Sequence, residues 1–164
     1  MSKLYFTRSG ADRIMQKKQD LLIKLKTTQG KKAEAADVGG NQWHDNFSFE
    51  QLMRDEDMLN LQIKEVNEII SRMVIVDQAS TDISKLRIGH IAVLETEGDI
   101  KSYLIGGFED SEEDTDPPVI SYLAPLIRQF IGKAVGHVSS VQIEGRLKKV
   151  TLKDIILPKK RKEE

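Results

Sequence analysis

The chain has no cysteine among its 164 residues. Disulfides, zinc–thiolate sites and thiol nucleophiles are therefore excluded. No apolar run approaches the roughly 20 residues that a membrane-spanning helix needs. Residues 1–8 also lack the apolar core of a signal peptide. We therefore expect a cytoplasmic protein with no membrane partner.

The chain also has almost no net charge, with a formal value of −1. Its overall field does not draw it to nucleic acid or to an anionic membrane, so we expect any relation to DNA to be indirect. No helix-turn-helix or zinc motif argues for a DNA-binding regulator. The length and the mixture of apolar and charged residues are typical of one or two small globular domains.

Aromatic residues are few, and their placement is uneven. Trp43, which is the only tryptophan, lies within seven residues of Phe47 and Phe49, and His44 and Asp45 lie between them. This stretch separates two segments that both have helical periodicity. Aromatic side chains at an exposed bend indicate a tip that reaches into a partner.

The first predicted helix begins between Thr7 and Ser9, where Ser9 is a plausible N-cap and Asp12 follows three residues later. It has a thin stripe of period 3.5 that fades toward the helix-breaking pair Gly39-Gly40. The residues on this stripe are Ile14, Leu21, Leu25, Thr28 and Ala35.

The second predicted helix has a clearer stripe, with intervals of 7, 4, 3, 4 and 3 residues that are typical of a two-stranded coiled coil. Its members are Leu52, Leu59, Ile63, Val66, Ile70 and Met73. Ser48 to Gln51 resembles a capping box, and the β-branched run 74–76 favours an extended segment. Two helices of about 30 residues would each be about 45 Å long. Narrow stripes on both predict an antiparallel hairpin.

The second half of the chain has strand periodicity. Strands are predicted at 91–94 and 102–105 with a turn near Gly98, and a final hairpin at 138–143 and 147–156. A polar acidic loop is predicted at 109–118, and a short helix at 124–131 that Gly132 stops. The fold class is therefore α+β, with an antiparallel sheet following the helical hairpin.

Three motifs resemble the Gre family of bacterial transcript-cleavage factors: Thr7-Arg8-Ser9-Gly10-Ala11, residues 120–136 (ISYLAPLIRQFIGKAVG) and the hairpin 141–155. The resemblance covers most of the chain. It implies a coiled-coil hairpin at 1–77, an FKBP-like polymerase-docking domain at 78–158 and a charged tail at 159–164.

The resemblance implies a monomeric accessory factor, which is not itself an enzyme. It would bind bacterial RNA polymerase and insert its tip into the secondary channel, near the 3′ end of the nascent RNA. There, tip carboxylates help to hold Mg²⁺ and a water in the active site of the polymerase, so that backtracked RNA is cut. The factor would carry no cofactor of its own. Carboxylate oxygens suit Mg²⁺, and the metal activates water.

The family pattern Gly-Asp-x-x-Glu-Asn is altered here. Residues 40–46 read Gly-Asn-Gln-Trp-His-Asp-Asn, so Asp45-Asn46 matches Glu-Asn, while Asn41 and Gln42 are neutral where the first acid is expected. Asp45 is the predicted assisting carboxylate and metal ligand, and His44 is a weaker candidate as proton relay or ligand. The factor either stimulates cleavage or occupies the channel as a non-cleaving modulator or inhibitor.

Further site predictions come from the resemblance and from charge. The predicted tip contacts are Asn41, Gln42, Trp43, Asn46 and Phe47. The predicted polymerase-docking residues are Ser121, Pro125, Leu126 and Arg128. The predicted basic residues near the RNA are Lys24, Lys31 and Lys32, because residues 1–37 hold nine Lys or Arg against four acids.

Simpler interpretations stand beside these. Asp45 or Asn46 could cap the second helix, Phe49 could be a hydrophobic staple, and the lysines could form a solvated face. The acidic residues of 109–116 are best interpreted as a solubilising loop. An isomerase activity of the FKBP-like domain is disfavoured because its aromatic residues are scattered. A plain coiled-coil interaction protein is disfavoured by the C-terminal motif.

Overall fold

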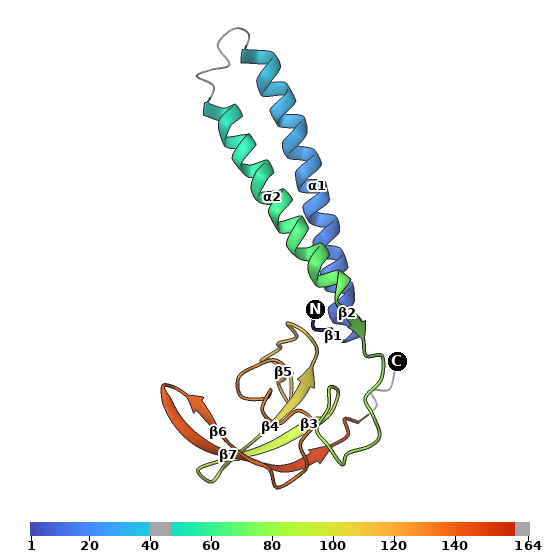
Figure 1. The fold of residues 1–164 in the computed structure, drawn as a ribbon, viewed down its shortest axis with the longest axis vertical. Helices are drawn as coiled ribbons and strands as arrows, with labels where there is room; N and C mark the ends of the chain where they lie inside the picture. The colour runs from blue at the N-terminus through green and yellow to red at the C-terminus, as the bar shows by residue number, and fades with distance from the viewer. Residues whose placement is uncertain (40–46, 160–164) are drawn as a thin grey trace. The chain divides into compact units, whose positions relative to one another are not determined.

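The computed structural model describes residues 1–39 and 47–159. The chain divides into two compact units (Figure 1). The helix unit comprises Met1–Leu4 and Ala11–Met73, and the sheet unit comprises Tyr5–Gly10 and Val74–Glu164. No helix within the described ranges is long and apolar enough to cross a lipid bilayer.

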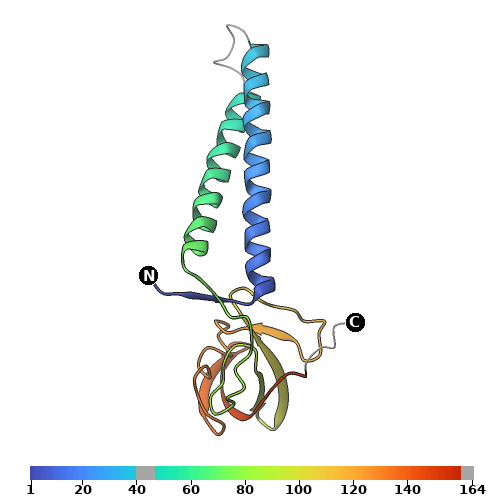
Figure 2. The same cartoon turned by 90° about the vertical axis from the view of Figure 1, so that its right-hand side faces the viewer.

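The helix unit contains α1 (Arg8–Gly39, 32 residues) and α2 (Phe47–Ser71, 25 residues), with the first turn of α1 reaching back into the sheet unit. The two helices lie side by side and run in opposite directions (Figure 2). Their apolar stripes supply the contact: Ile14 and Leu21 of α1 and Val66 of α2 are buried. The helical periodicity of both segments is thus realised as helix, and the stripes are turned away from solvent.

The helix boundaries correct two predicted caps. The backbone N–H of Gly10 donates to Thr7 Oγ1 at 3.1 Å, so Thr7 caps α1 in place of Ser9. The second helix begins at Phe47, one residue before Ser48, so Ser48 lies inside the first turn. Both errors arise because several neighbouring residues can supply a capping oxygen.

A two-stranded sheet lies where α2 ends. It pairs β1 (Leu4–Phe6) with β2 (Met73–Ile75). The N–H of Leu4 donates to the carbonyl of Arg72 at 2.8 Å, and the N–H of Val76 donates to the carbonyl of Phe6 at 2.7 Å. The extended segment after α2 was predicted, whereas β1 was not, since three residues carry too little pattern.

The main sheet has five strands in the order β5-β4-β3-β7-β6. Their bounds are β3 Ile91–Thr96, β4 Asp99–Gly106, β5 Val119–Ser121, β6 Val138–Ile143 and β7 Arg146–Ile156. The two predicted hairpins, β3–β4 and β6–β7, are both present and antiparallel. The sheet is mainly antiparallel, as predicted, and departs from this at one edge, where β5 pairs with β4 in parallel.

The core of the sheet unit lies between this sheet and the segment that follows β5. Leu152 of β7 and Ile127 and Phe130 of that segment are fully buried and belong to one apolar cluster. Residues 122–131 form a series of turns, with bonds such as Ile127 N–H to Ala124 C=O at 2.9 Å. The predicted short helix at 124–131 is therefore wrong: Pro125 lies in a turn, and the successive turns bury Ile127 and Phe130 in the core.

The acidic loop is partly structural. The carboxylate of Asp110 is buried, and its Oδ2 accepts from Gly107 N–H at 2.8 Å and from Thr7 Oγ1 at 2.7 Å. Glu109 and the acids from Glu112 to Asp116 are exposed, as expected of a solubilising loop. That interpretation is wrong for Asp110, which anchors the residue that caps α1.

Candidate functional site

The residues predicted to act at the tip are Asn41, Gln42, Trp43, His44, Asp45 and Asn46, and all six lie outside the described residues. The structure defines what flanks them. The first helix ends at Gly39 and the second begins at Phe47. Phe47 keeps 73% of its surface exposed, and the guanidinium carbon of Arg54 lies 5.9 Å from the centre of its ring. A cation over an exposed aromatic ring is an ordinary surface contact, so the ring remains open to a partner.

The three predicted basic residues do not share one environment. Lys24 and Lys31 are exposed and line the same groove between the helices, together with Ile23, Asp55 and Met58. Lys32 is half-buried, and its ammonium forms an ion pair with Glu56 of α2. Of the three, Lys24 and Lys31 therefore stay available for an outside anion, whereas Lys32 is engaged within the protein.

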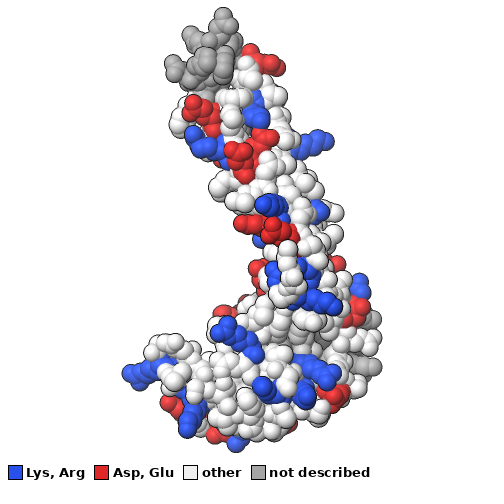
Figure 3. All heavy atoms as spheres, viewed as in Figure 1, with Lys and Arg blue, Asp and Glu red and all other residues white. Residues whose placement is uncertain are grey.

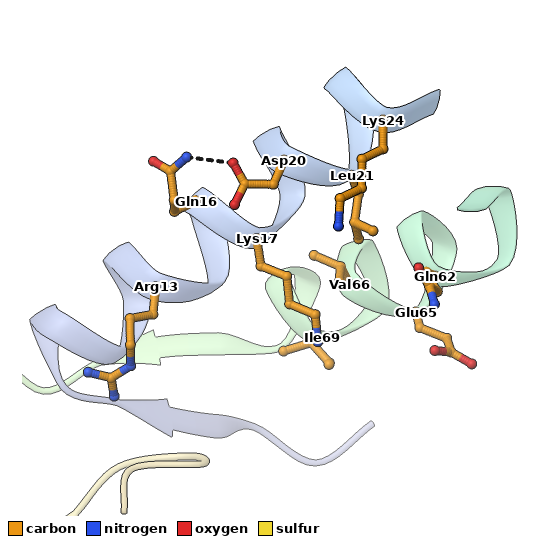
Figure 4. A pocket seen from close by; sticks show the side chains of 10 residues that line it. All are labelled: Arg13, Gln16, Lys17, Asp20, Leu21, Lys24, Gln62, Glu65, Val66 and Ile69. Atoms are coloured by element: carbon orange, nitrogen blue, oxygen red, sulfur yellow. Dashed lines mark hydrogen bonds between the residues drawn. The ribbon is translucent and has the colours of Figure 1, made fainter. Parts of the chain in front are cut away.

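A second groove continues along the same flank toward the start of α1 (Figure 4). It has a volume of about 650 Å³ and shares Lys24 and Gln62 with the first groove. Its walls carry Arg13 and Lys17, but also Asp20 and Glu65. The space-filling view shows the same mixture, with basic and acidic side chains interspersed along the helices (Figure 3). The basic residues of the N-terminal segment are therefore interspersed with acidic residues along this groove.

Glu56 is a functional candidate that sequence reasoning missed. Its Oε1 accepts from Gln29 Nε2 at 2.9 Å, and its Oε2 contacts the Lys32 ammonium. The bond from Lys32, followed by that from Gln29, holds the pKa of Glu56 below its ordinary value of 4.5. Its signal in the sequence was indirect: Lys32 falls four residues after Thr28, on the apolar stripe itself.

The predicted docking residues lie together in the sheet unit. Ser121 ends β5, and the turns that follow it carry Pro125, Leu126 and Arg128, of which Pro125 and Arg128 are exposed. Pro125 and Leu126 border a hollow of about 560 Å³ that Tyr103, Ile120 and Ile143 also line. Salt bridges at its rim join Lys148 to Glu97 at 3.1 Å and Lys101 to Asp99 at 3.5 Å. The hollow thus has an apolar floor and a charged rim.

The aromatic residues of the sheet unit do not converge on one pocket. Tyr103 lines the hollow beside Pro125, Tyr122 stands against Tyr5 with ring centres 6.0 Å apart, and Phe130 is fully buried. Phe108 packs on Phe6 at 5.2 Å. Tyr5 and Tyr122 line one further cavity together. Within the described residues, no cluster of acids and histidines suits a metal ion.

Another apolar cavity, of about 430 Å³, lies beside the segment that follows β2. Leu86 and Ile88 of that segment line it, opposite Tyr122 and Ile131. His90 supports the segment from inside: it is fully buried, Nδ1 accepts from Arg87 N–H at 3.2 Å, and Nε2 lies 2.7 Å from the Ser80 carbonyl. The segment after β2 is thus held by hydrogen bonds at this point.

The chain combines a pair of long helices with a unit built around a five-stranded sheet, and candidate residues lie at the helix ends and beside one hollow of the sheet unit. No family profile matches the chain. Individual curated proteins do match it along most of its length. It is 27% identical over 158 residues to transcription elongation factor GreA of Flavobacterium psychrophilum, covering 92% of this chain and 95% of that one. It is 26% identical over 155 residues to GreA of Rickettsia bellii, covering 90% and 91%.

Among solved structures, the chain aligns with GreA factor homolog 1 of Thermus thermophilus, at 21% identity, with a TM-score of 0.42 and coverage of 93% and 98%. The sequence alignments with GreA proteins run along most of both chains. They support a Gre-family factor, the resemblance that the sequence motifs predicted. The names of these relatives support a transcription elongation factor.

Proposed function

We propose that this chain binds bacterial RNA polymerase, inserts the tip between α1 and α2 into the secondary channel and promotes cleavage of backtracked RNA. The observation that carries the proposal is the alignment with GreA proteins along more than nine-tenths of the chain. The two long helices are consistent with it, since α1 and α2 end and begin on either side of residues 40–46. The factor acts as a monomer on the polymerase and is not an enzyme on its own.

The proposed chemistry belongs to the polymerase. Mg²⁺ there would supply a Lewis acid that activates water. This chain would offer the Asp45 carboxylate as one oxygen ligand, a type that Mg²⁺ prefers. Lys24 and Lys31, on one flank of α1, would attract the phosphates of the displaced RNA. His44 would hold or pass a proton near Asp45.

The proposed docking surface lies on an FKBP-like sheet unit. Pro125 is exposed and lines a hollow with an apolar floor, and Arg128 is exposed three residues later in the same series of turns. An apolar pocket with a charged rim is the usual form of a binding hot spot. Arg128→Glu is expected to weaken binding to polymerase, whereas Lys133→Glu, a charge reversal at an exposed residue that is not among the predicted docking residues, is the matched control.

The test uses stalled, backtracked elongation complexes. Adding the protein is expected to shorten the RNA from its 3′ end, and Asp45→Asn is expected to abolish shortening while polymerase binding persists. Asp57→Asn, a change at an exposed acid of α2, serves as the matched control. Unchanged cleavage by the Asp45 variant would leave that residue only a capping role, and absence of polymerase binding would reject the proposal altogether.

A second candidate function is a non-cleaving modulator or inhibitor. It is favoured by one feature of the sequence, the neutral pair Asn41-Gln42 where the family pattern has its first acid. In the same assay this candidate predicts no shortening, together with competition against a cleavage-competent factor. Restoring an acid by Asn41→Asp, or separately by Gln42→Asp, should then produce cleavage.

A further inference from the structure

The ion pair between the helices lies on a seam that is mainly apolar. The seam positions of α1 follow intervals of 7, 4, 3, 4 and 3 residues, the same series as in α2. On α1 these positions are Ile14, Leu21, Leu25, Thr28, Lys32 and Ala35. Lys32 lies 18 residues after Ile14, which is about five full helical turns, so both side chains leave α1 in the same direction. A lysine therefore occupies a position where the pattern calls for an apolar residue.

The partners of Lys32 are well defined. Its ammonium contacts Glu56 Oε2, while Gln29 Nε2 donates to Oε1, so both oxygens of the carboxylate are occupied by groups of α1. The Glu56 side chain is 16% exposed and that of Lys32 is 30% exposed. The pair is thus far less exposed than Arg54–Glu50, an ion pair within α2 whose side chains are more than half exposed. The lowered pKa of Glu56 agrees with a carboxylate held in its charged form.

Such a pair discriminates between registers in a way that the apolar seam does not. The seam carries Ile14, Leu21 and Leu25 on α1 and a longer apolar series on α2, so a sliding of α2 by one heptad still brings apolar residues of α2 against those of α1. The same sliding separates Glu56 from Lys32 and places a charge against apolar side chains, which is unfavourable. In coiled coils a single polar seam residue is known to specify register at the expense of stability.

The pair also stands near the candidate tip. Lys32 lies seven residues before the last residue of α1, and Glu56 lies nine residues after the first residue of α2. We propose that Lys32, Glu56 and Gln29 form a register lock, which fixes the alignment of α1 and α2 toward Gly39 and Phe47, at the ends of the helices away from the β1–β2 pair. The three are positioning residues. Their consequence for cleavage rests on the proposed function, whereas their effect on register does not.

The alternative is a pair that only stabilises the helices, and the two roles predict opposite results. Replacing an ion pair that is largely shielded from solvent by apolar residues often leaves stability unchanged or raises it. In the variant Lys32→Leu/Glu56→Leu, a register lock therefore predicts unchanged or higher thermal stability together with loss of a single register. A purely stabilising pair predicts lower stability with the register retained.

The test uses the absence of native cysteine. Spin labels on Lys26→Cys and Asn60→Cys, two exposed positions on different helices, report the helix alignment through the distribution of their separation. We expect one narrow population in the parent. The double leucine variant should gain a second population displaced by about 5 Å for each turn of sliding. The charge-swapped pair Lys32→Glu/Glu56→Lys should restore one population.

Thr28→Leu is the matched control, because it adds an apolar side chain at a neighbouring seam position and leaves the pair intact. It should keep one population. A single unchanged population in the double leucine variant would overturn the proposal. Loss of helicity in that variant would overturn it too, since the pair would then be needed for folding.

A second readout separates this proposal from the proposed function. In the cleavage assay the double leucine variant should show a lower maximal cleavage rate, by at least about tenfold given the sensitivity of catalysis to misplacement. The half-saturating concentration should be unchanged, because the predicted docking residues are intact. If the parent does not cleave, the proposed function fails while the label distances still decide the register lock. A double variant that has two registers and cleaves at the parental rate rejects the positioning role.

Discussion

The helix unit and the sheet unit are each stabilised internally by different kinds of contact. In α2, Val66 alone among the described residues is buried, and a half-buried ion pair joins α2 to α1. The sheet unit instead encloses a continuous apolar cluster that includes Phe130, Ile127 and Leu152. A narrow seam leaves alignment to a few polar contacts, whereas a closed core fixes every neighbour through shape. Polar contacts therefore determine how two elements align where the apolar area between those elements is small.

The strongest test of this contrast removes one buried side chain from each unit. Phe130→Ala should lower the free energy of unfolding of the sheet unit by about 3–5 kcal/mol, since the ring is fully buried. Val66→Ala should lower that of the helix unit by only about 1–2 kcal/mol, because two methyl groups at ~0.8 kcal/mol each are lost. Hydrogen–deuterium exchange resolved by segment measures both. Equal losses would contradict the contrast.

A second test adds one methyl group to a glycine in each unit. A Cβ on Gly107 would lie 2.6 Å from the backbone nitrogen of Thr7 and 2.9 Å from the Phe6 Cα, and backbone atoms cannot yield cheaply. Gly107→Ala should therefore destabilise by about 1–3 kcal/mol.

The matched change is Gly30→Ala in α1, where nothing lies within 4 Å of the added atom. It should stabilise the helix by about 1 kcal/mol. Urea denaturation followed by circular dichroism measures both changes. Destabilisation by Gly30→Ala would mean that other atoms contact α1 at Gly30, where the structure leaves open space.

A third test concerns the start of α1. Thr7→Ala removes the oxygen that accepts from Gly10 N–H and the hydroxyl that donates to Asp110, and should destabilise by about 1–2 kcal/mol. Thr7→Ser should recover most of the loss. Ser9→Ala should be nearly neutral, because Ser9 does not cap the helix. Thermal denaturation compares the three, and a larger loss for Ser9 than for Thr7 would reverse the assignment of the cap.

The smallest effect is expected from acid. The folded-state pKa of Glu56 lies below 4.5, so its stabilisation is present above the unfolded-state value and is lost as pH falls through the folded-state value. Glu56→Gln should flatten this part of the pH profile of the helix unit. The urea midpoint, measured from neutral pH down to below the folded-state pKa, tests it. An identical acid response in parent and variant would show that the carboxylate contributes nothing.

Much of the fold could be predicted because its determinants are local. Period 3.5 stripes fixed both helices, and the turn residues at Gly98 and Gly145, both with positive φ, marked the two hairpins. What failed depends on distant partners. The strand β5 forms by pairing with β4. Residues 124–131 have a sequence that favours a helix, but they form turns that place Ile127 and Phe130 in the core.

The candidate site divides in the same way. The sequence predicted Pro125 and Arg128 together, and the structure places both in exposed turns. It could not predict that the Lys32 ammonium would form an ion pair with Glu56, because Glu56 lies 24 residues away on another helix. Asp110 looked like one acid among six, and its burial and its contacts with Thr7 and Gly107 distinguish it. The tip residues 41–46 stay predictions.

The bond between Thr7 and Asp110 spans 103 positions in the chain. During synthesis, Phe6 and Thr7 leave the ribosome long before Gly107, Phe108 and Asp110 have been translated. Domains otherwise tend to fold in order from the N-terminus. The first segment made is therefore among the last to reach its final partners. Until then the ring of Phe6, which is buried in the folded protein, has no core to enter.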